Sequence, residues 1–198
     1  MKIEILYPEI CTLYGDKGNT MYLQKCLPDA EFVTTGLNEK PLFLKENIDM
    51  VYMCSMSEKS QELVLDRLMQ YKDEIAACMK DGKALFLLVG NSMELLGDYI
   101  KREDGTRVTG LGVVPGMYSV RQTPNRFNTL IKAKFNDMTL IGYTSRFAHT
   151  YGIPDDMTFC KVEIGQGSNP DTMNEGICKN RVIATYIHGP LLIQNPDF

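Results

Sequence analysis

The chain has 198 residues, of which 44% are apolar and 23% are charged, as in a globular protein that buries its own core. The net charge is −4 and basic residues form no run, so nucleic-acid binding is not expected. No apolar stretch approaches the roughly 18 residues that a membrane-spanning helix needs, so the sequence predicts no membrane span.

The N-terminus and the cysteines both indicate a cytoplasmic protein. Residues 1–9 read MKIEILYPE, which begins directly with a strand pattern and lacks the layout of a secretory signal. The six cysteines are scattered, without a C-x-x-C pair or the spacing of a metal site. We therefore expect reduced thiols, no metal ion and no cofactor.

The first half of the chain alternates predicted strands with predicted helices. The strands are expected at residues 2–7, 30–34, 48–53 and 84–89. One helix is expected at residues 19–26, and a longer one follows the capping-box pattern Ser55-x-x-Glu58 and ends at Gly82. Strands joined by helices predict a mostly parallel sheet. Ligands bind such sheets beyond the carboxyl ends of the strands, here after Tyr7, Met53 and Val89.

The second half has the composition of short β-strands. They are expected at residues 129–135, 138–143, 159–164 and 182–187. Asn136-Asp137 and Lys179-Asn180 are expected to form hairpin turns, and residues 165–176 a polar loop. Because the chain shows no linker and no repeat, we predict a single domain, residues 1–198, with an antiparallel extension.

Residues 84–97, ALFLLVGNSMELLG, predict a buried strand, a tight turn and the start of a helix. Turns of this kind present nucleophiles in many α/β enzymes, because they push one side chain out over the sheet edge. The residue at the tip is Gly90, which has no side chain to react.

Five segments together resemble one family. They are LYGDKGN (13–19), the strand and turn at 84–97, GLGVVPG (110–116), NRF (125–127) and ATYIHGPLLIQNP (184–196). In this order they resemble the class I glutamine amidotransferases of the cobyric-acid-synthase type. Within that family the sequence is most similar to the glutaminase subunits of lipid II isoglutaminyl synthases.

The resemblance implies a flavodoxin-like α/β fold, in which helices flank a mostly parallel central sheet and the C-terminal half adds antiparallel strands. It also implies glutamine hydrolysis: an elbow Cys attacks the side-chain amide, a His serves as base and acid, and backbone N–H groups stabilise the oxyanion. Ammonia then passes to a partner. For the lipid II enzymes the implied partner is an ATP-dependent, Mur-ligase-like synthase subunit that acts on a peptidoglycan precursor.

Carrying the family's elbow, C-G-G-Y-Q-L-L-G, onto this chain places Gly90 at the position of the catalytic Cys, so the nucleophile is absent. Asn91 and Ser92 stand at the two glycines and Glu94 at the Gln. His188 stands at the catalytic His. Pro190 follows where other members carry an acidic residue, which the lipid II glutaminases also lack.

The positions implied to bind substrate have also changed. The family's loop after the third strand is Gly-rich and helps to form the oxyanion hole, whereas here it contains Cys54 and Ser55. Residues 143–150 keep little of the family's F-E-N-H-x-G-R-T. Arg126 matches a family Arg near the glutamine site. The substrate-binding candidates are Arg126, Cys54, Ser55, Asn91 and Ser92.

Asp16 and Asn19 of LYGDKGN are expected to tether a loop or cap the following helix.

These observations predict a degenerate amidotransferase subunit that keeps the fold and the partner surface but lacks the nucleophile. Its candidate partners are a Mur-ligase-like synthase and a small ligand such as glutamine. Two alternatives stay open. One is an active glutaminase whose nucleophile has moved to Cys54 or Ser92, and the other is a sensor module that binds an unrelated metabolite.

Overall fold

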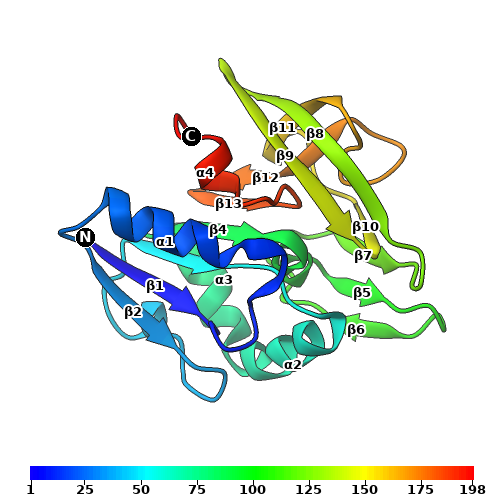
Figure 1. Ribbon diagram of the computed structural model, residues 1–198. Coiled ribbons are helices and arrows are strands. Elements are labelled where there is room, and N and C mark those ends of the chain that lie inside the picture. Colours follow the sequence, from blue (N-terminus) through cyan, green and yellow to red (C-terminus); the bar gives the residue numbers. More distant parts are fainter.

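A computed structural model describes all residues, 1–198, and contains two sheets (Figure 1). The larger has nine strands in the order β2-β1-β3-β4-β13-β12-β11-β8-β9, and the smaller has four in the order β10-β7-β5-β6. None of the helices combines the length and the apolar character that a membrane span requires.

One half of the large sheet is parallel and the other is antiparallel. The parallel half is made of β1 (Lys2–Leu6), β2 (Glu31–Thr35), β3 (Met50–Met53), β4 (Leu85–Val89) and β13 (Val182–Thr185). The antiparallel half is made of β12 (Asn174–Lys179), β11 (Thr158–Ile164), β8 (Phe127–Phe135) and β9 (Met138–Arg146). The small sheet contains β5 (Tyr99–Lys101), β6 (Arg107–Thr109), β7 (Tyr118–Arg121) and β10 (Ala148–Tyr151).

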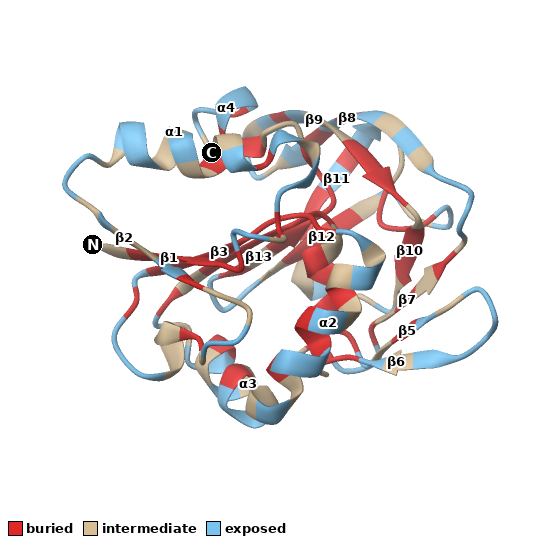
Figure 2. Ribbon diagram, turned by 60° about the horizontal axis from the view of Figure 1, so that its bottom comes forward, coloured by how far each residue is buried: buried red, intermediate tan, exposed pale blue.

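Helices cover both faces of the parallel half. In Figure 2, α1 and α4 lie on one side of the strands and α2 and α3 on the other. The helices are α1 (Lys17–Cys26), α2 (Glu58–Leu68), α3 (Lys72–Asp81) and α4 (Leu191–Gln194). A cluster of 42 buried apolar residues runs through both halves of the large sheet without interruption. The predicted α/β class, with a parallel sheet and an antiparallel extension, is confirmed.

Several predicted boundaries are wrong for local reasons. Ser55 does not cap a helix; α2 begins three residues later, and the hydroxyl of Ser57 accepts the amide of Ser60 at 3.2 Å. The helix expected to run to Gly82 is divided by a 3₁₀ turn at Met69–Tyr71. The second hairpin turn lies one residue later than predicted, at Asn180 and Arg181, because both adopt positive φ, 49° and 62°.

Five strands were not predicted. β5, β6, β7 and β10 have only three or four residues each and, unlike the equally short β3 and β13, contain no run of apolar residues. β12 begins inside the expected polar loop. Its Glu175 has a polar side chain, as expected of a loop, but the side chain is buried and accepts hydrogen bonds from Thr185 and the amide of Tyr186.

The segment after β13 closes the outer edge of β9. The side chain of Asn195 binds both backbone groups of Ile141, accepting its N–H at 2.8 Å and donating to its carbonyl at 2.9 Å. The backbones of His188 and Tyr143 also exchange two hydrogen bonds, N–H to carbonyl in both directions. The outward backbone groups of Ile141 and Tyr143 in this edge strand are thus satisfied, and His188 is held beside β9.

Candidate functional site: the elbow after β4

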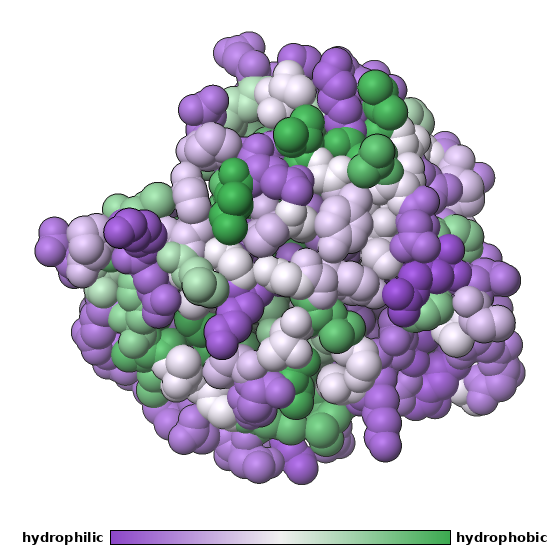
Figure 3. All heavy atoms as spheres, in the orientation of Figure 1, coloured by the Kyte–Doolittle hydropathy of each residue, from purple (hydrophilic) through white to green (hydrophobic).

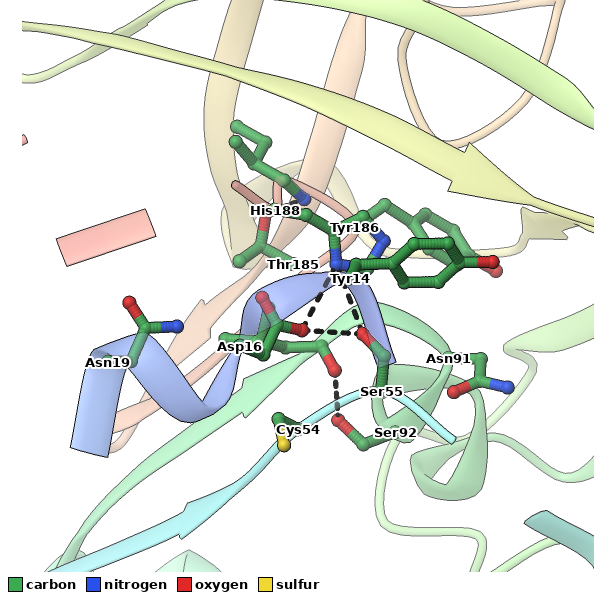
Figure 4. Close-up of polar contacts among 12 residues, drawn as sticks. Tyr14, Asp16, Asn19, Cys54, Ser55, Asn91, Ser92, Thr185, Tyr186 and His188 are labelled. Carbon is green, nitrogen blue, oxygen red and sulfur yellow. Dashed lines mark hydrogen bonds and ion pairs between the residues drawn. The ribbon is translucent and has the colours of Figure 1, made fainter. Parts of the chain in front are cut away.

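Four loops meet at the carboxyl edge of the parallel strands, where the sequence placed the ligand site (Figure 4). β4 lies between β3 and β13, so the elbow at Gly90 faces the loop after β3 and the segment after β13. The loop after β1 adds Asp16. Gly90 is buried and has φ +72°, the left-handed conformation of a sharp strand-to-helix elbow.

Asp16, Ser55 and His188 form a closed cluster, which we call the His188 triangle. Ser55 Oγ donates to Asp16 Oδ2 at 2.7 Å. His188 Nδ1 lies 3.0 Å from Ser55 Oγ and 3.3 Å from Asp16 Oδ2. A serine has one hydroxyl proton and a carboxylate only accepts, so Nδ1 carries a proton and donates to this pair. The three side chains are 0–1% exposed.

Two polar atoms of the triangle have no partner in the chain, and aromatic rings cover the imidazole. His188 Nε2 and Asp16 Oδ1 are buried without a hydrogen bond. The ring of Tyr14 lies 4.7 Å from the imidazole and that of Tyr143 lies 5.8 Å away, measured between centroids. The Tyr143 hydroxyl donates to the carbonyl of Tyr14 at 3.3 Å. The imidazole is thus enclosed, with an acceptor or donor still free at Nε2.

Residue 90 has no room for a side chain. A Cβ built on Gly90 would overlap Ser55 Oγ and would stand 2.5 Å from His188 Cε1 and 2.9 Å from Ser55 Cβ. Real Cβ atoms essentially never approach other heavy atoms this closely. A side chain at residue 90 would therefore strain the backbone and would require Ser55 and His188 to shift.

Asn91 fastens the elbow to the loop after β3. Its Oδ1 accepts the amide of Met56 at 3.0 Å and its Nδ2 donates to the carbonyl of Met56 at 2.7 Å. The amide of Met56 belongs to the loop where the resemblance places the oxyanion hole, and here a side chain of the protein already occupies it.

The sequence matches the CobB/CobQ-like glutamine amidotransferase domain family over residues 2–196, essentially its full length. The chain belongs to this family. It is 28% identical over 201 residues to the GatD subunit of lipid II isoglutaminyl synthase (glutamine-hydrolyzing) from Streptococcus pneumoniae, covering 100% of this chain and 76% of that protein. It is 25% identical over 185 residues to the Staphylococcus aureus GatD subunit, covering 92% and 74%.

Solved amidotransferases share the fold at low sequence identity. One glutamine amidotransferase aligns with a TM-score of 0.63 at 13% identity, covering 98% of this chain and 93% of its own. A second, from Thermotoga maritima, gives 0.59 at 13% identity, covering 95% and 75%. The Thermotoga maritima PurLQS structure gives 0.57 at 13% identity, covering 94% and 86%. The predicted class I amidotransferase fold is therefore confirmed.

In this CobB/CobQ-like chain, neither residue considered as a relocated nucleophile contacts His188. Cys54 Sγ donates to the carbonyl of Cys11 at 2.7 Å, pointing away from the imidazole (Figure 4), and burial raises the pKa of this thiol to about 12. Ser92 Oγ is buried and donates to the carbonyl of Val89 at 2.8 Å. Both groups are committed to backbone carbonyls, and the thiol is not ionised near neutral pH.

Arg126 lies outside this cluster. Its guanidinium is exposed, stacks on the ring of Phe147 at 4.5 Å and makes none of the hydrogen bonds of the triangle. No group of three or more His, Cys, Asp or Glu side chains in the protein could hold a metal ion.

Asp16 and Asn19 of the LYGDKGN segment act as tethers, one of the two roles expected for them. Asn19 is a tether, as predicted: its Nδ2 donates to Tyr52 Oη at 2.9 Å and its Oδ1 accepts the amide of Leu192 at 2.9 Å. The side chain of Asp16 does not cap α1; it tethers the loop after β1 to Ser55 and His188. Asp16 follows β1 in the sequence, and loops that follow parallel strands lie at the ligand edge of the sheet. This position alone could have predicted that Asp16 lies near the elbow.

A second polar cluster, which we call the elbow network, lies beneath the elbow and was missed by sequence reasoning. Glu94 Oε1 accepts the hydroxyl of Tyr186 at 2.9 Å, and Oε2 accepts Gln61 Nε2 at 3.0 Å. Gln61 also donates to the carbonyl of Asn91 at 2.7 Å and accepts Arg121 Nη2 at 2.8 Å. Burial raises the pKa of Glu94 to about 6. The network joins α2, the elbow and the end of β13.

Proposed function

We propose that this protein is a degenerate glutaminase-type subunit that keeps the amidotransferase fold without hydrolysing glutamine. In this proposal it acts as the partner or regulatory subunit of an ATP-dependent, Mur-ligase-like synthase in cell-wall biogenesis. The observation that carries the proposal is the elbow: Gly90 stands where the family's nucleophile would be, and no Cβ fits there.

The size of the expected defect supports inactivity. In enzymes that work through a covalent intermediate, loss of the nucleophile lowers turnover by about 10⁶. Backbone donors of an oxyanion hole recover only part of such a loss, and here the amide of Met56 is already bound by Asn91.

The geometry gives no support to a relocated nucleophile at Cys54 or Ser92, since both bind backbone carbonyls away from the imidazole. Ser55 has the one hydroxyl beside His188, but its proton is directed at the Asp16 carboxylate and the side chain is 1% exposed. A carboxylate is a weak base for a serine, and no substrate carbonyl could reach the oxygen without opening the site.

The partner role is supported by the named relatives and by one surface. Both GatD relatives are subunits of a synthase. Apolar side chains gather on the face of β8, β9 and β11 (Figure 3), where Leu130 is 76%, Ile141 49% and Ile164 59% exposed. Exposed apolar patches of this kind mark interaction sites.

The six cysteines are free, as suits a cytoplasmic protein.

Glutamate release tests the loss of activity. The protein is incubated with glutamine, alone and with a Mur-ligase-like synthase, and compared with His188→Ala. We expect no release above the variant in either case. Release that the His188→Ala change abolishes would overturn the proposal.

The partner role has its own test. A paired Leu130→Glu, Ile164→Glu variant is expected to lose binding to the synthase in a pull-down with purified proteins. Leu63→Glu on α2, which replaces a leucine that is 40% exposed, is the matched control and should bind normally. Equal binding by all three proteins would exclude this face as the interface.

A further inference from the structure

We propose that Ser55 occupies the place of the missing nucleophile, so that residues 55 and 90 are coupled: residue 90 can carry a side chain only when residue 55 gives up its own. The inference deepens the proposed function and rests on it, because the position at residue 90 is vacant only if the family's nucleophile has been lost. It identifies Ser55 as a positioning residue and as a second lesion that restoring a cysteine at residue 90 would not repair.

The steric evidence is a clash between the elbow after β4 and the loop after β3. A Cβ at residue 90 would overlap Ser55 Oγ and lie 2.9 Å from Ser55 Cβ, and both atoms belong to the loop after β3. β3 and β4 are paired in register from Met50 and Leu85 to Met53 and Leu88, so neither loop can move far without disturbing the sheet. Close packing of this kind makes an added carbon costly.

The chemical evidence is that Ser55 has taken over a polar role. Its hydroxyl donates to Asp16 at 2.7 Å and lies 3.0 Å from His188 Nδ1. It therefore links the loop after β1 to the segment after β13 in the space between the elbow and the imidazole. A glycine at residue 55 would free this space but would leave Asp16 and His188 bridged only by their own 3.3 Å contact.

Backbone strain has to be separated from the steric clash. Gly90 has φ +72°, so any residue placed there is strained whatever the space. Gly105, in the turn between β5 and β6, has φ +85° and nothing within 4 Å of a built Cβ. Gly105→Ala therefore measures the strain alone, and Gly90→Ala measures strain and clash together.

A double-mutant cycle tests the coupling. Thermal midpoints are measured for the parent, Gly90→Ala, Ser55→Gly, the double variant and Gly105→Ala. We expect Gly90→Ala to lower the midpoint by about 8 °C more than Gly105→Ala does. Ser55→Gly should lower the midpoint in the parent and raise it in the Gly90→Ala background. A Ser55→Gly effect of the same sign and size in both backgrounds would overturn the inference.

A graded series keeps the test decisive if Gly90→Ala fails to fold. Ser55→Ala removes the hydroxyl but keeps the Cβ at 2.9 Å, so it should rescue Gly90→Ala less than Ser55→Gly does. If the single variant is insoluble, a soluble double variant with glycine at residue 55 supports the coupling. A double variant that is insoluble as well contradicts it.

The cycle reads stability, whereas the proposed function is tested by glutamate release, so the two can fail separately. An active parent with coupled midpoints would refute the loss of activity and leave the coupling intact. An inactive parent with additive midpoints would do the reverse. Release that disappears in Ser55→Ala, together with a glutamyl ester on Ser55 seen by mass spectrometry of the parent, would make Ser55 a nucleophile and overturn its role as a filler of the vacant position.

Discussion

Two buried polar clusters meet at the elbow, and they differ in how completely they are paired. In the elbow network both carboxylate oxygens of Glu94 and both ends of the Gln61 amide have partners, and the unpaired buried atom is Arg121 Nε, at the margin of the network. In the His188 triangle, His188 Nε2 and Asp16 Oδ1 have none. A buried polar group left unpaired costs free energy, so the pairing of Glu94 and Gln61 stabilises the fold. The network therefore has a structural role. The triangle retains the unpaired atoms that are typical of a reactive site.

The difference teaches which part of the amidotransferase framework this chain has kept. The network holds the elbow in its sharp conformation by joining α2 to the 3₁₀ segment Gly90–Leu96. The triangle lies above the same elbow, where Ser55 and Gly90 depart from the family pattern and His188 keeps it. Under the proposed function, the turn geometry has been preserved while the chemistry that it presents has not.

Glu94→Ala should break the network most severely. It leaves one Gln61 proton without an acceptor, and it leaves the Tyr186 hydroxyl with only the Thr150 hydroxyl, 2.6 Å away, in a fully buried place. We expect the free energy of unfolding to fall by about 3 kcal/mol, measured by urea denaturation. A loss below about 1 kcal/mol would show that the network does not support the elbow.

The pH dependence of stability should report the same carboxyl group. Burial raises the folded-state pKa of Glu94 from 4.5 to about 6, so its favourable contribution is complete below about pH 4.5 and is lost as the pH rises through 6. The parent should lose about 2 kcal/mol across this window relative to Glu94→Gln, since one pKa unit is worth about 1.4 kcal/mol. Urea titrations of both proteins at several pH values measure the difference. If the free energies of unfolding of the two proteins changed with pH in parallel, the raised pKa of the buried Glu94 carboxyl would be contradicted.

Asp16→Asn should perturb the triangle far less. The amide oxygen can still accept from Ser55 and His188, and the nitrogen replaces an oxygen that had no partner. We expect the free energy of unfolding to fall by no more than about 1 kcal/mol. A loss as large as that of Glu94→Ala would mean that the carboxylate charge is essential to the fold.

The smallest effect concerns the thiols. Burial raises the pKa of Cys54 to about 12, and the side chain is bonded to a backbone carbonyl. Cys26, at the end of α1, is exposed. Iodoacetamide at pH 7 should alkylate Cys26 and spare Cys54, as read by peptide mass spectrometry. Rapid alkylation of Cys54 would reopen it as a candidate nucleophile.

Sequence patterns were sufficient for the framework. The strand at 84–89, the elbow glycine and the hairpin turn at Asn136 could be predicted, because a buried run, a left-handed turn and a period of two leave local signals. The β-type composition and the hairpin turns of the second half also predicted the antiparallel extension, and the family motifs added the meeting of Gly90 with His188.

The cluster geometry could not be predicted in the same way. Ser55 fits the capping-box pattern, whereas Ser57, the residue that caps α2, is followed three residues later by Ser60 and does not. Only the approach of Asp16 and His188, 39 residues before and 133 residues after Ser55, decides the role of Ser55. Glu94, Gln61 and Tyr186 likewise come from three separate segments. Long-range contacts of this kind leave no trace in local periodicity, so neither buried network is visible along the chain.

The most direct test of the central claim is covalent trapping with a diazoketone analogue of glutamine, which alkylates the nucleophile of working glutaminases. The protein, with and without the synthase partner, is incubated with the analogue beside a glutaminase that has an intact elbow cysteine, and intact masses are measured. We predict an unchanged mass for this protein and one adduct on the control. An adduct mapped to Ser55, Cys54 or Ser92 would show that a nucleophile survives and would contradict the account.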